Sequence, residues 1–102
     1  MNALLSHIKG KFIRSIEKTD SWHISFGDVF LTIHNPVTIE PAEKGNNPNS
    51  LRDLMVEDVK EYGSNLSIIM SSNVVLRINL SPEAYTGPEA MTLKTHDKFI
   101  VW

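Results

Sequence analysis

Apolar and polar residues alternate strictly on both sides of short turns in two stretches of this sequence, a pattern typical of β-hairpins. In residues 21–34 apolar side chains occupy alternate positions on both sides of Gly27 and Asp28, a two-residue turn signal. Pairing the two arms across that turn gives three apolar pairs on one face: Trp22 with Ile33, Ile24 with Leu31, and Phe26 with Val29. Because turn length fixes the register of a hairpin, this sorting of the faces predicts an antiparallel β-hairpin.

A second stretch, residues 66–78, repeats the pattern around a turn in which Asn73 can adopt a left-handed conformation. Its apolar face pairs Leu66 with Ile78, Ile68 with Leu76, and Met70 with Val74. An additional strand is expected before each hairpin, over residues 11–18 and 55–61, so each unit is predicted to be a three-strand meander. Matching spacing and turns favour an internal duplication of residues 8–36 and 51–82 over a chance likeness of two amphipathic hairpins.

These units predict a mainly β fold in one domain of 102 residues, or an α+β fold if the N-terminal segment 3–8 is helical. The meanders are expected to pack their apolar faces together as a small sandwich or an open barrel. A linker over residues 38–50, rich in proline, glycine and asparagine, joins them. C-terminal strands are expected within residues 90–102. The predicted core comprises Ile13, Ile16, Trp22, Ile24, Phe26, Leu31, Ile33, Val56, Val59, Leu66, Ile68, Leu76, Ile78 and Trp102.

Charge and composition limit the partners. The chain has 10 Lys and Arg residues against 12 Asp and Glu residues, for a net charge of −2. Nothing in this balance favours a phosphate backbone, so no nucleic-acid partner is expected. The absence of cysteine excludes disulfides and thiolate chemistry, and fits a reducing cytoplasm. Since neither a signal pattern nor a long apolar run is present, we expect a cytoplasmic protein with no membrane segment.

Histidines are the candidate chemical groups. The register of the first hairpin puts His23 and His34 on one sheet face as diagonal neighbours, with Asp20 close by. Such a group can supply a general base, half of a metal site or a polar ligand pocket. The alternative is a pair of solvated imidazoles on a polar sheet face. His23, His34 and Asp20 are therefore candidate ligand-binding residues, and no metal or cofactor is implied.

No catalytic motif accompanies these residues. The serines lie in neither a G-x-S-x-G nor an S-x-x-K pattern, and the glycines are spread one to a turn. The carboxylates lack the spacing of a calcium-binding loop. We therefore assign no catalytic residue and expect binding rather than catalysis.

Three apolar residues fall on sheet faces that should be polar. Phe30 lies on the outer face of the first hairpin, and Ile69 and Val75 form an outer pair in the second. Apolar residues at such positions indicate a second layer or a partner. The layer could be the N-terminal segment or the terminal strands, and the partner could be a second copy in a symmetric dimer. Phe30, Ile69 and Val75 are therefore candidate interface residues.

One further pattern runs through the second half of the chain: a leucine-rich entry, two alternating strands, a late tyrosine and a final strand ending in tryptophan. It is carried by Leu51, Leu54, Val56, Val59, residues 66–68 and 76–78, Tyr85, residues 89–91 and residues 100–102. In this order it resembles small uncharacterised bacterial β-domain proteins, which include suspected immunity proteins encoded beside toxin genes and products of mobile integron gene cassettes. Met91 departs from the tryptophan of that pattern, and the glycines before the last strand are absent. The resemblance implies no catalytic residue.

Two function classes follow. The first is a non-catalytic interaction protein that binds a protein partner or itself. The second is a small-ligand-binding or minor enzymatic domain, in which His23, His34 and Asp20 converge in a pocket between the meanders. A cleft that gathers the three side chains would favour the second class.

Overall fold

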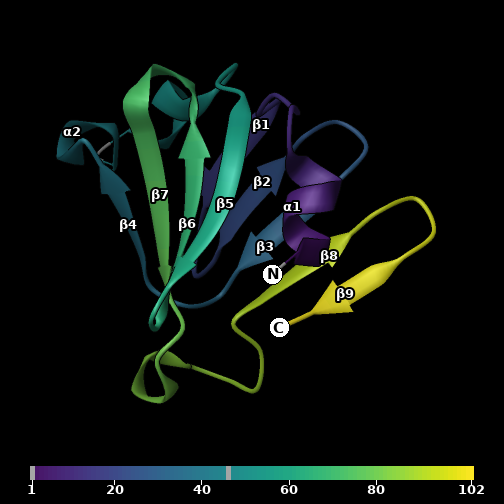
Figure 1. Ribbon diagram of the computed structural model, residues 1–102, viewed down its shortest axis with the longest axis vertical. Coiled ribbons are helices and arrows are strands. Elements are labelled where there is room, and N and C mark those ends of the chain that lie inside the picture. Colours follow the sequence, from purple (N-terminus) through teal and green to yellow (C-terminus); the bar gives the residue numbers. More distant parts are fainter. Residues whose placement is uncertain (1, 46) are drawn as a thin grey trace.

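The alternating segments form two antiparallel sheets that face each other across an apolar core (Figure 1). The computed structural model describes residues 2–45 and 47–102. The first sheet has the strand order β1-β2-β3-β8-β9 and the second has the order β4-β7-β6-β5. Over the described residues the sheets do not close into a barrel, so the mainly β class and the sandwich arrangement are confirmed.

The first sheet contains the first predicted meander and the C-terminal strands. Its strands are β1 (Ser15–Lys18), β2 (Trp22–Ser25), β3 (Phe30–Ile33), β8 (Met91–Lys94) and β9 (Phe99–Val101). The predicted register is confirmed, since Trp22 pairs with Ile33 and Ile24 pairs with Leu31. Gly27 has φ of 99°, a conformation that side chains disfavour, which explains the glycine in this turn.

The second sheet contains the second predicted meander and one additional strand. Its strands are β4 (Val37–Glu40), β5 (Val56–Tyr62), β6 (Asn65–Met70) and β7 (Val74–Asn79). The predicted pairs of β6 and β7 are confirmed, from Leu66 with Ile78 to Met70 with Val74. A register shift between Val56 and Asp58 marks a bulge in β5.

A short N-terminal helix, α1 (Asn2–Ile8), lies between β5 and β8, across one open side of the sandwich (Figure 1). Its Leu4 and Ile8 side chains are fully buried in the core, which explains why the helix packs here. The remaining helical segments are α2 (Ala42–Gly45), η1 (Pro48–Leu51), η2 (Ser71–Asn73) and η3 (Pro82–Ala84). Among the described helices none is long and apolar enough to cross a membrane.

The expected linker over residues 38–50 is more structured than its composition indicates. It begins inside β4, where Ile39 is buried and pairs with Leu76, and it continues through α2 and η1. The prolines on both sides of β4, Pro36 and Pro41, mask its alternation in the sequence. Asn46 in this segment lies outside the described residues.

The first predicted strand is shorter than expected, because its beginning belongs to the contact between the sheets. The Ile13 amide donates to the Leu54 carbonyl, and Phe12 forms a bridge with Met55. Residues 11–13 therefore tie the entry of β1 to the segment before β5.

The core joins both sheets and α1 in one cluster of buried residues. Every predicted core residue is buried except Trp102, which is half-buried and packs against the edge of the cluster. The buried hydrophobic residues that the prediction did not include are Leu4, Ile8, Val29, Ile39, Leu51, Met70, Val74, Ala90, Met91 and Leu93.

Candidate functional site

The structure brings His34 and Asp20 to one hollow. His34 follows β3, and Asp20 lies in the turn between β1 and β2. Both line an open depression of about 270 Å³ together with Lys18, Trp22 and Asn35. His34 Nδ1 shares a hydrogen bond of 2.8 Å with Ser21 Oγ, which fixes the orientation of the half-buried imidazole.

His23 does not join them. It is exposed on the outer face of β2, where Nε2 lies 3.1 Å from Thr19 Oγ1. It lines a separate depression of about 260 Å³ with Glu17, Phe30 and Thr32. The three candidate ligand-binding residues are therefore divided between two depressions and do not converge in one pocket.

Metal-ligating side chains are not clustered. Over residues 2–45 and 47–102 no group of three or more His, Asp or Glu side chains is placed to hold a metal ion. Ser21, in the bend before β2, is hydrogen-bonded to His34, but among the described residues no carboxylate is hydrogen-bonded to His34 to complete a charge relay. Ser25 Oγ accepts from the Gly27 amide. The arrangement supports hydrogen bonding by the histidines and no assembled catalytic group.

Asn35 is a buried polar residue in the lining of the Asp20–His34 depression. Its side chain is 2% exposed, and Nδ2 donates to the Asn79 carbonyl at 2.8 Å. Its Oδ1 atom has no hydrogen-bond partner among the described residues. A buried acceptor in this state favours a donor, because an unsatisfied polar group costs about 1–3 kcal/mol.

The candidate interface residues lie on opposite outer faces of the sandwich. Phe30 is on the outer face of the first sheet and is 48% exposed. Ile69 and Val75 pair across β6 and β7 on the outer face of the second sheet, where both are half-buried. One interface cannot contain all three unless it wraps around the molecule. Neither α1, which packs into the core, nor β8 and β9, which extend the first sheet, forms a layer over them.

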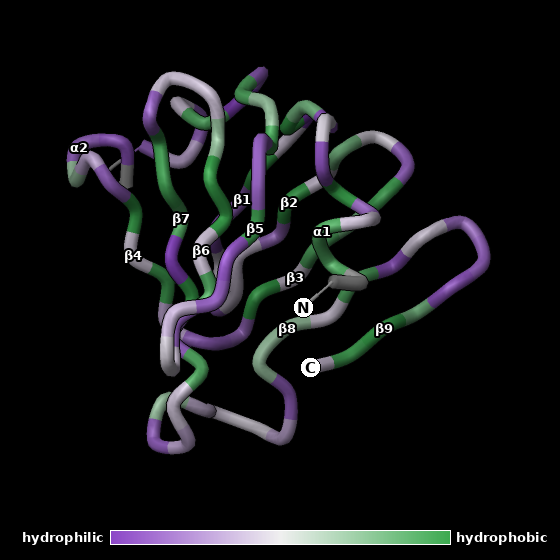
Figure 2. The backbone as a smooth tube through the Cα atoms, viewed as in Figure 1, coloured by the Kyte–Doolittle hydropathy of each residue, from purple (hydrophilic) through white to green (hydrophobic). Residues whose placement is uncertain are grey.

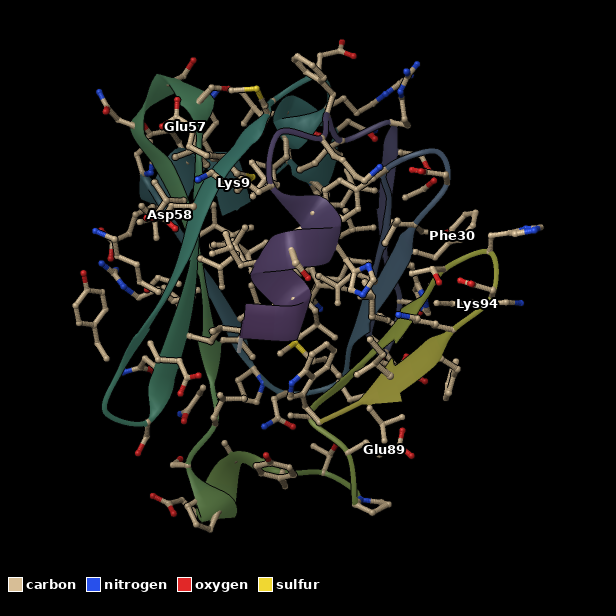
Figure 3. The ribbon with its side chains drawn as sticks, turned by 45° about the vertical axis from the view of Figure 1, so that its right-hand side comes forward. Lys9, Phe30, Glu57, Asp58, Glu89 and Lys94 are labelled. Carbon is tan, nitrogen blue, oxygen red and sulfur yellow. The ribbon has the colours of Figure 1, made fainter. Side chains whose placement is uncertain are left out.

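Phe30 shares its face with two exposed residues of β9. Register places Phe30 beside Lys94, Lys94 beside Phe99, and Thr92 beside Val101, so Phe30, Phe99 and Val101 all face outward. Phe99 is 66% exposed and Val101 47%. We call Phe30, Phe99 and Val101 the apolar cluster. Figure 3 shows Phe30 and Lys94 projecting from this side of the molecule. By register, Lys94 lies between Phe30 and Phe99.

The apolar cluster holds three of the five exposed large hydrophobic side chains in the described part of the chain; the others are Phe12 and Tyr62. Sequence reasoning included Phe30 and missed Phe99 and Val101. The signal was present, because residues 99–102 are apolar at every position. A strand turns alternate side chains to opposite faces, so two of these four residues had to point away from the core.

The outer face of the second sheet is charged in contrast. Ile69 and Val75 are paired with each other on this face. Glu40 of β4 lies beside Val75, and Asp58 of β5 lies beside Ile69. In the next row Arg77 forms an ion pair with Glu40, and Lys60 lies opposite Ser67. Charged side chains therefore border the apolar pair of this face. Among the described residues paired with the apolar cluster of the first sheet, Lys94 alone is charged.

One ion pair ties the first hairpin to the N-terminal part of the chain. Lys11 Nζ lies 3.0 Å from both carboxylate oxygens of Asp28, in the turn before β3. The hydrogen bond from Lys11 lowers the pKa of the Asp28 carboxyl below its usual value. Because Asp28 is exposed, this contact orients the turn and adds little to the free energy of unfolding.

Comparisons of this chain with family models, with curated proteins and with solved structures give no match.

Proposed function

We propose that this chain is a non-catalytic interaction protein that binds a protein partner through the apolar cluster Phe30, Phe99 and Val101. The observation that carries the proposal is the gathering of three exposed large apolar side chains on one sheet face. Exposed apolar patches on small proteins mark interaction surfaces more often than isolated exposed residues do.

The energetics favour burial of this face. Covering apolar area stabilises a complex by about 25 cal/mol per Å², and a fully buried aromatic side chain contributes about 1.5–3 kcal/mol. Phe30 and Phe99 each retain much of that contribution, because about half or more of each residue is exposed. Aromatic residues are also the ones enriched at the centres of protein interfaces.

A photo-crosslinking amino acid at position 99 tests this proposal in cells that produce the protein. The matched control carries the same group at Tyr62, an aromatic residue of similar exposure (60%) in the second sheet. We expect a protein adduct from position 99 and none from position 62. Adducts of equal yield from both positions, or none from position 99, would contradict the proposal.

An immunity-like or mobile-cassette role belongs to this same class of function. Its support is the resemblance of the second half of the sequence, which brings no catalytic residue with it. The equivalent strand order and registers of β1–β3 and β5–β7 support an internal duplication of residues 8–36 and 51–82. We expect such a protein in the cytoplasm, on the ground that it contains no cysteine.

A small-ligand role is the second candidate, and the free Oδ1 acceptor of Asn35 favours it. This buried atom belongs to a residue that lines the depression with His34, Asp20 and the Trp22 ring. Because Oδ1 and the Trp22 ring are both buried, a small planar donor reaches Oδ1 by displacing these side chains at the floor of the depression.

Phenol and toluene separate this candidate from non-specific apolar binding. The two molecules have nearly the same shape, and phenol alone carries a donor. In two-dimensional NMR spectra we expect millimolar phenol to shift the Asn35 side-chain amide and the Trp22 indole signals, and toluene to leave them in place. Equal responses to both compounds, or no response to phenol, would exclude this candidate.

A further inference from the structure

The strand β9 ends the first sheet and has β8 as its paired neighbour. The Trp102 amide donates to the Met91 carbonyl, and the Lys98 carbonyl accepts from the Thr95 amide, so residues 98 and 102 turn their backbone groups toward β8. Backbone groups alternate along an antiparallel strand. The N–H and C=O groups of Phe99 and Val101 therefore point away from β8, toward the free edge.

The other three sheet edges of the described residues are protected against pairing. β1 carries Glu17 and Lys18, and η1 packs beside it. Prolines flank β4 on both sides. β5 contains a bulge, and its first residue exchanges hydrogen bonds with Gly10 and Lys11. Charges, prolines, bulges and covering segments are the devices by which proteins prevent edge-to-edge association.

Its three residues make β9 short, which itself limits pairing, but none of the other devices is present in this strand. Its residues, Phe99–Val101, include no charge and no proline, and its described pairing with β8 has no register shift. Figure 2 shows the strand as a hydrophobic stretch at the margin of the molecule. An edge with this chemistry is suited to receive another strand, which must be apolar and uncharged.

We propose that the strand received at this edge is β9 of a second copy of this chain, paired antiparallel about a twofold axis at Ile100. The inference rests on the proposed function, because it names the partner of the apolar cluster. Because the other three described edges are protected, β9 is the edge at which a second copy can pair. Antiparallel pairing of β9 with β9 of the second copy places apolar residues opposite apolar residues.

The backbone specifies the register of this pairing. The outward groups of Phe99 must meet those of Val101 in the second copy, and the reverse, which gives about four new backbone hydrogen bonds. Directly paired residues share a face, so the Phe99 and Val101 side chains of both copies form one outer cluster. On the inner face, the row of Leu31, Leu93 and Ile100 continues into the same row of the second copy.

Complementary charge substitutions test both the pairing and its register. We expect wild-type protein to have the mass of a dimer by light scattering at about 100 µM, well above a micromolar dissociation constant. Phe99→Lys and Val101→Glu alone should each raise that constant about 100-fold or more, because the two introduced charges of one dimer lie close together. An equimolar mixture should recover the dimer mass, since each new cation then faces a new anion.

Tyr62→Lys is the matched control, because it places the same charge at an exposed aromatic position on β5 of the second sheet, outside the apolar cluster. This variant should remain a dimer, and circular dichroism should show that every variant is folded. A monomeric wild type, or a mixture that stays monomeric while both variants are folded, would overturn the inference. If the chain is monomeric and position 99 crosslinks to a different protein, the inferred dimer is wrong and the proposed function stands.

Discussion

The strands β5 and β9 both end a sheet, and they are built in opposite ways. β5 has seven residues, a bulge and the charged side chains Glu57, Asp58, Lys60 and Glu61. β9 has three residues and none of these features. In Figure 3 the labelled acids Glu57 and Asp58 lie along β5, whereas Phe30 and Lys94 mark the opposite margin near β9.

This difference separates two tasks of a sheet edge. A long strand with free backbone groups would recruit other strands, so β5 carries repulsive charge and irregular geometry. The apolar edge of β9 is limited by its length alone, whereas the other edges of the described residues carry charge, proline or irregular geometry. We infer that β9 is kept open for a partner, and the following substitutions test that difference.

The largest expected effect comes from comparing two proline substitutions in β9, one at an amide that faces β8 and one at an amide that faces the free edge. Ile100→Pro removes an amide that points toward β8 and a half-buried side chain, so it should lower the free energy of unfolding by about 3 kcal/mol. Val101→Pro removes an amide at the free edge, so it should lower the stability of the monomer by less than about 1 kcal/mol while abolishing the dimer. Urea titration and light scattering measure the two effects. Equal destabilisation by both prolines would show that the assignment of the free edge is wrong.

A lysine on the outer face of the second sheet should leave the dimer intact, whereas a lysine at the β9 edge should not. Ile69→Lys lies in the second sheet, where its charge replaces a half-buried side chain, and should lower the free energy of unfolding by about 1 kcal/mol. Its dimer mass should equal that of the wild type, in contrast to Phe99→Lys. If Ile69→Lys gives a folded monomer, the interface lies on the second sheet.

The charges of the second sheet should matter little for stability. Glu40→Gln removes the ion pair with Arg77, whose side chain is 40% exposed, so the change should be at most about 0.5 kcal/mol and should vanish at high salt. Thermal unfolding at low and high ionic strength checks this expectation. A large loss that persists in salt would show that these charges stabilise the fold rather than protect the face.

The smallest effect concerns the Lys11–Asp28 contact. Because Lys11 lowers the pKa of Asp28 in the folded chain, this contact stabilises the fold above the unfolded pKa and loses its effect as the pH falls through the folded value. Lys11→Met should raise the pKa of Asp28 toward its ordinary value and slightly flatten the decline in stability at acid pH. NMR titration of the Asp28 carboxyl measures the shift, and an unchanged pKa in the variant would contradict the assigned cause.

Most of the fold could be predicted because the alternating segments decide it locally. The turn at Gly27 and Asp28 fixes one register, and the turn at residues 71–73 fixes the other. β4 could not be predicted in the same way. Its alternation is short and enclosed by Pro36 and Pro41, and its place beside β7 is decided by burial of Ile39 against a distant strand.

The candidate site was less predictable. His23 and His34 share a predicted face, but the Thr19 and Ser21 hydroxyls hold them in separate depressions, and that depends on turn conformation rather than on period. Phe99 and Val101 were missed because residues 99–102 are apolar throughout, so no alternation marks an outer face, and only Trp102 was assigned to the core. Which two residues point outward depends on the register between β9 and β8. The composition of the turn between these strands does not predict that register.

Amide hydrogen exchange along β9 shows whether a second copy pairs with this edge. At about 1 mM protein we expect the Phe99 and Val101 amides to exchange slowly, and at about 10 nM, far below a micromolar dissociation constant, to exchange fast. The Ile100 amide points toward β8 and should stay protected at both concentrations. Fast exchange of Phe99 and Val101 at both concentrations, with Ile100 protected, would contradict a second copy at this edge.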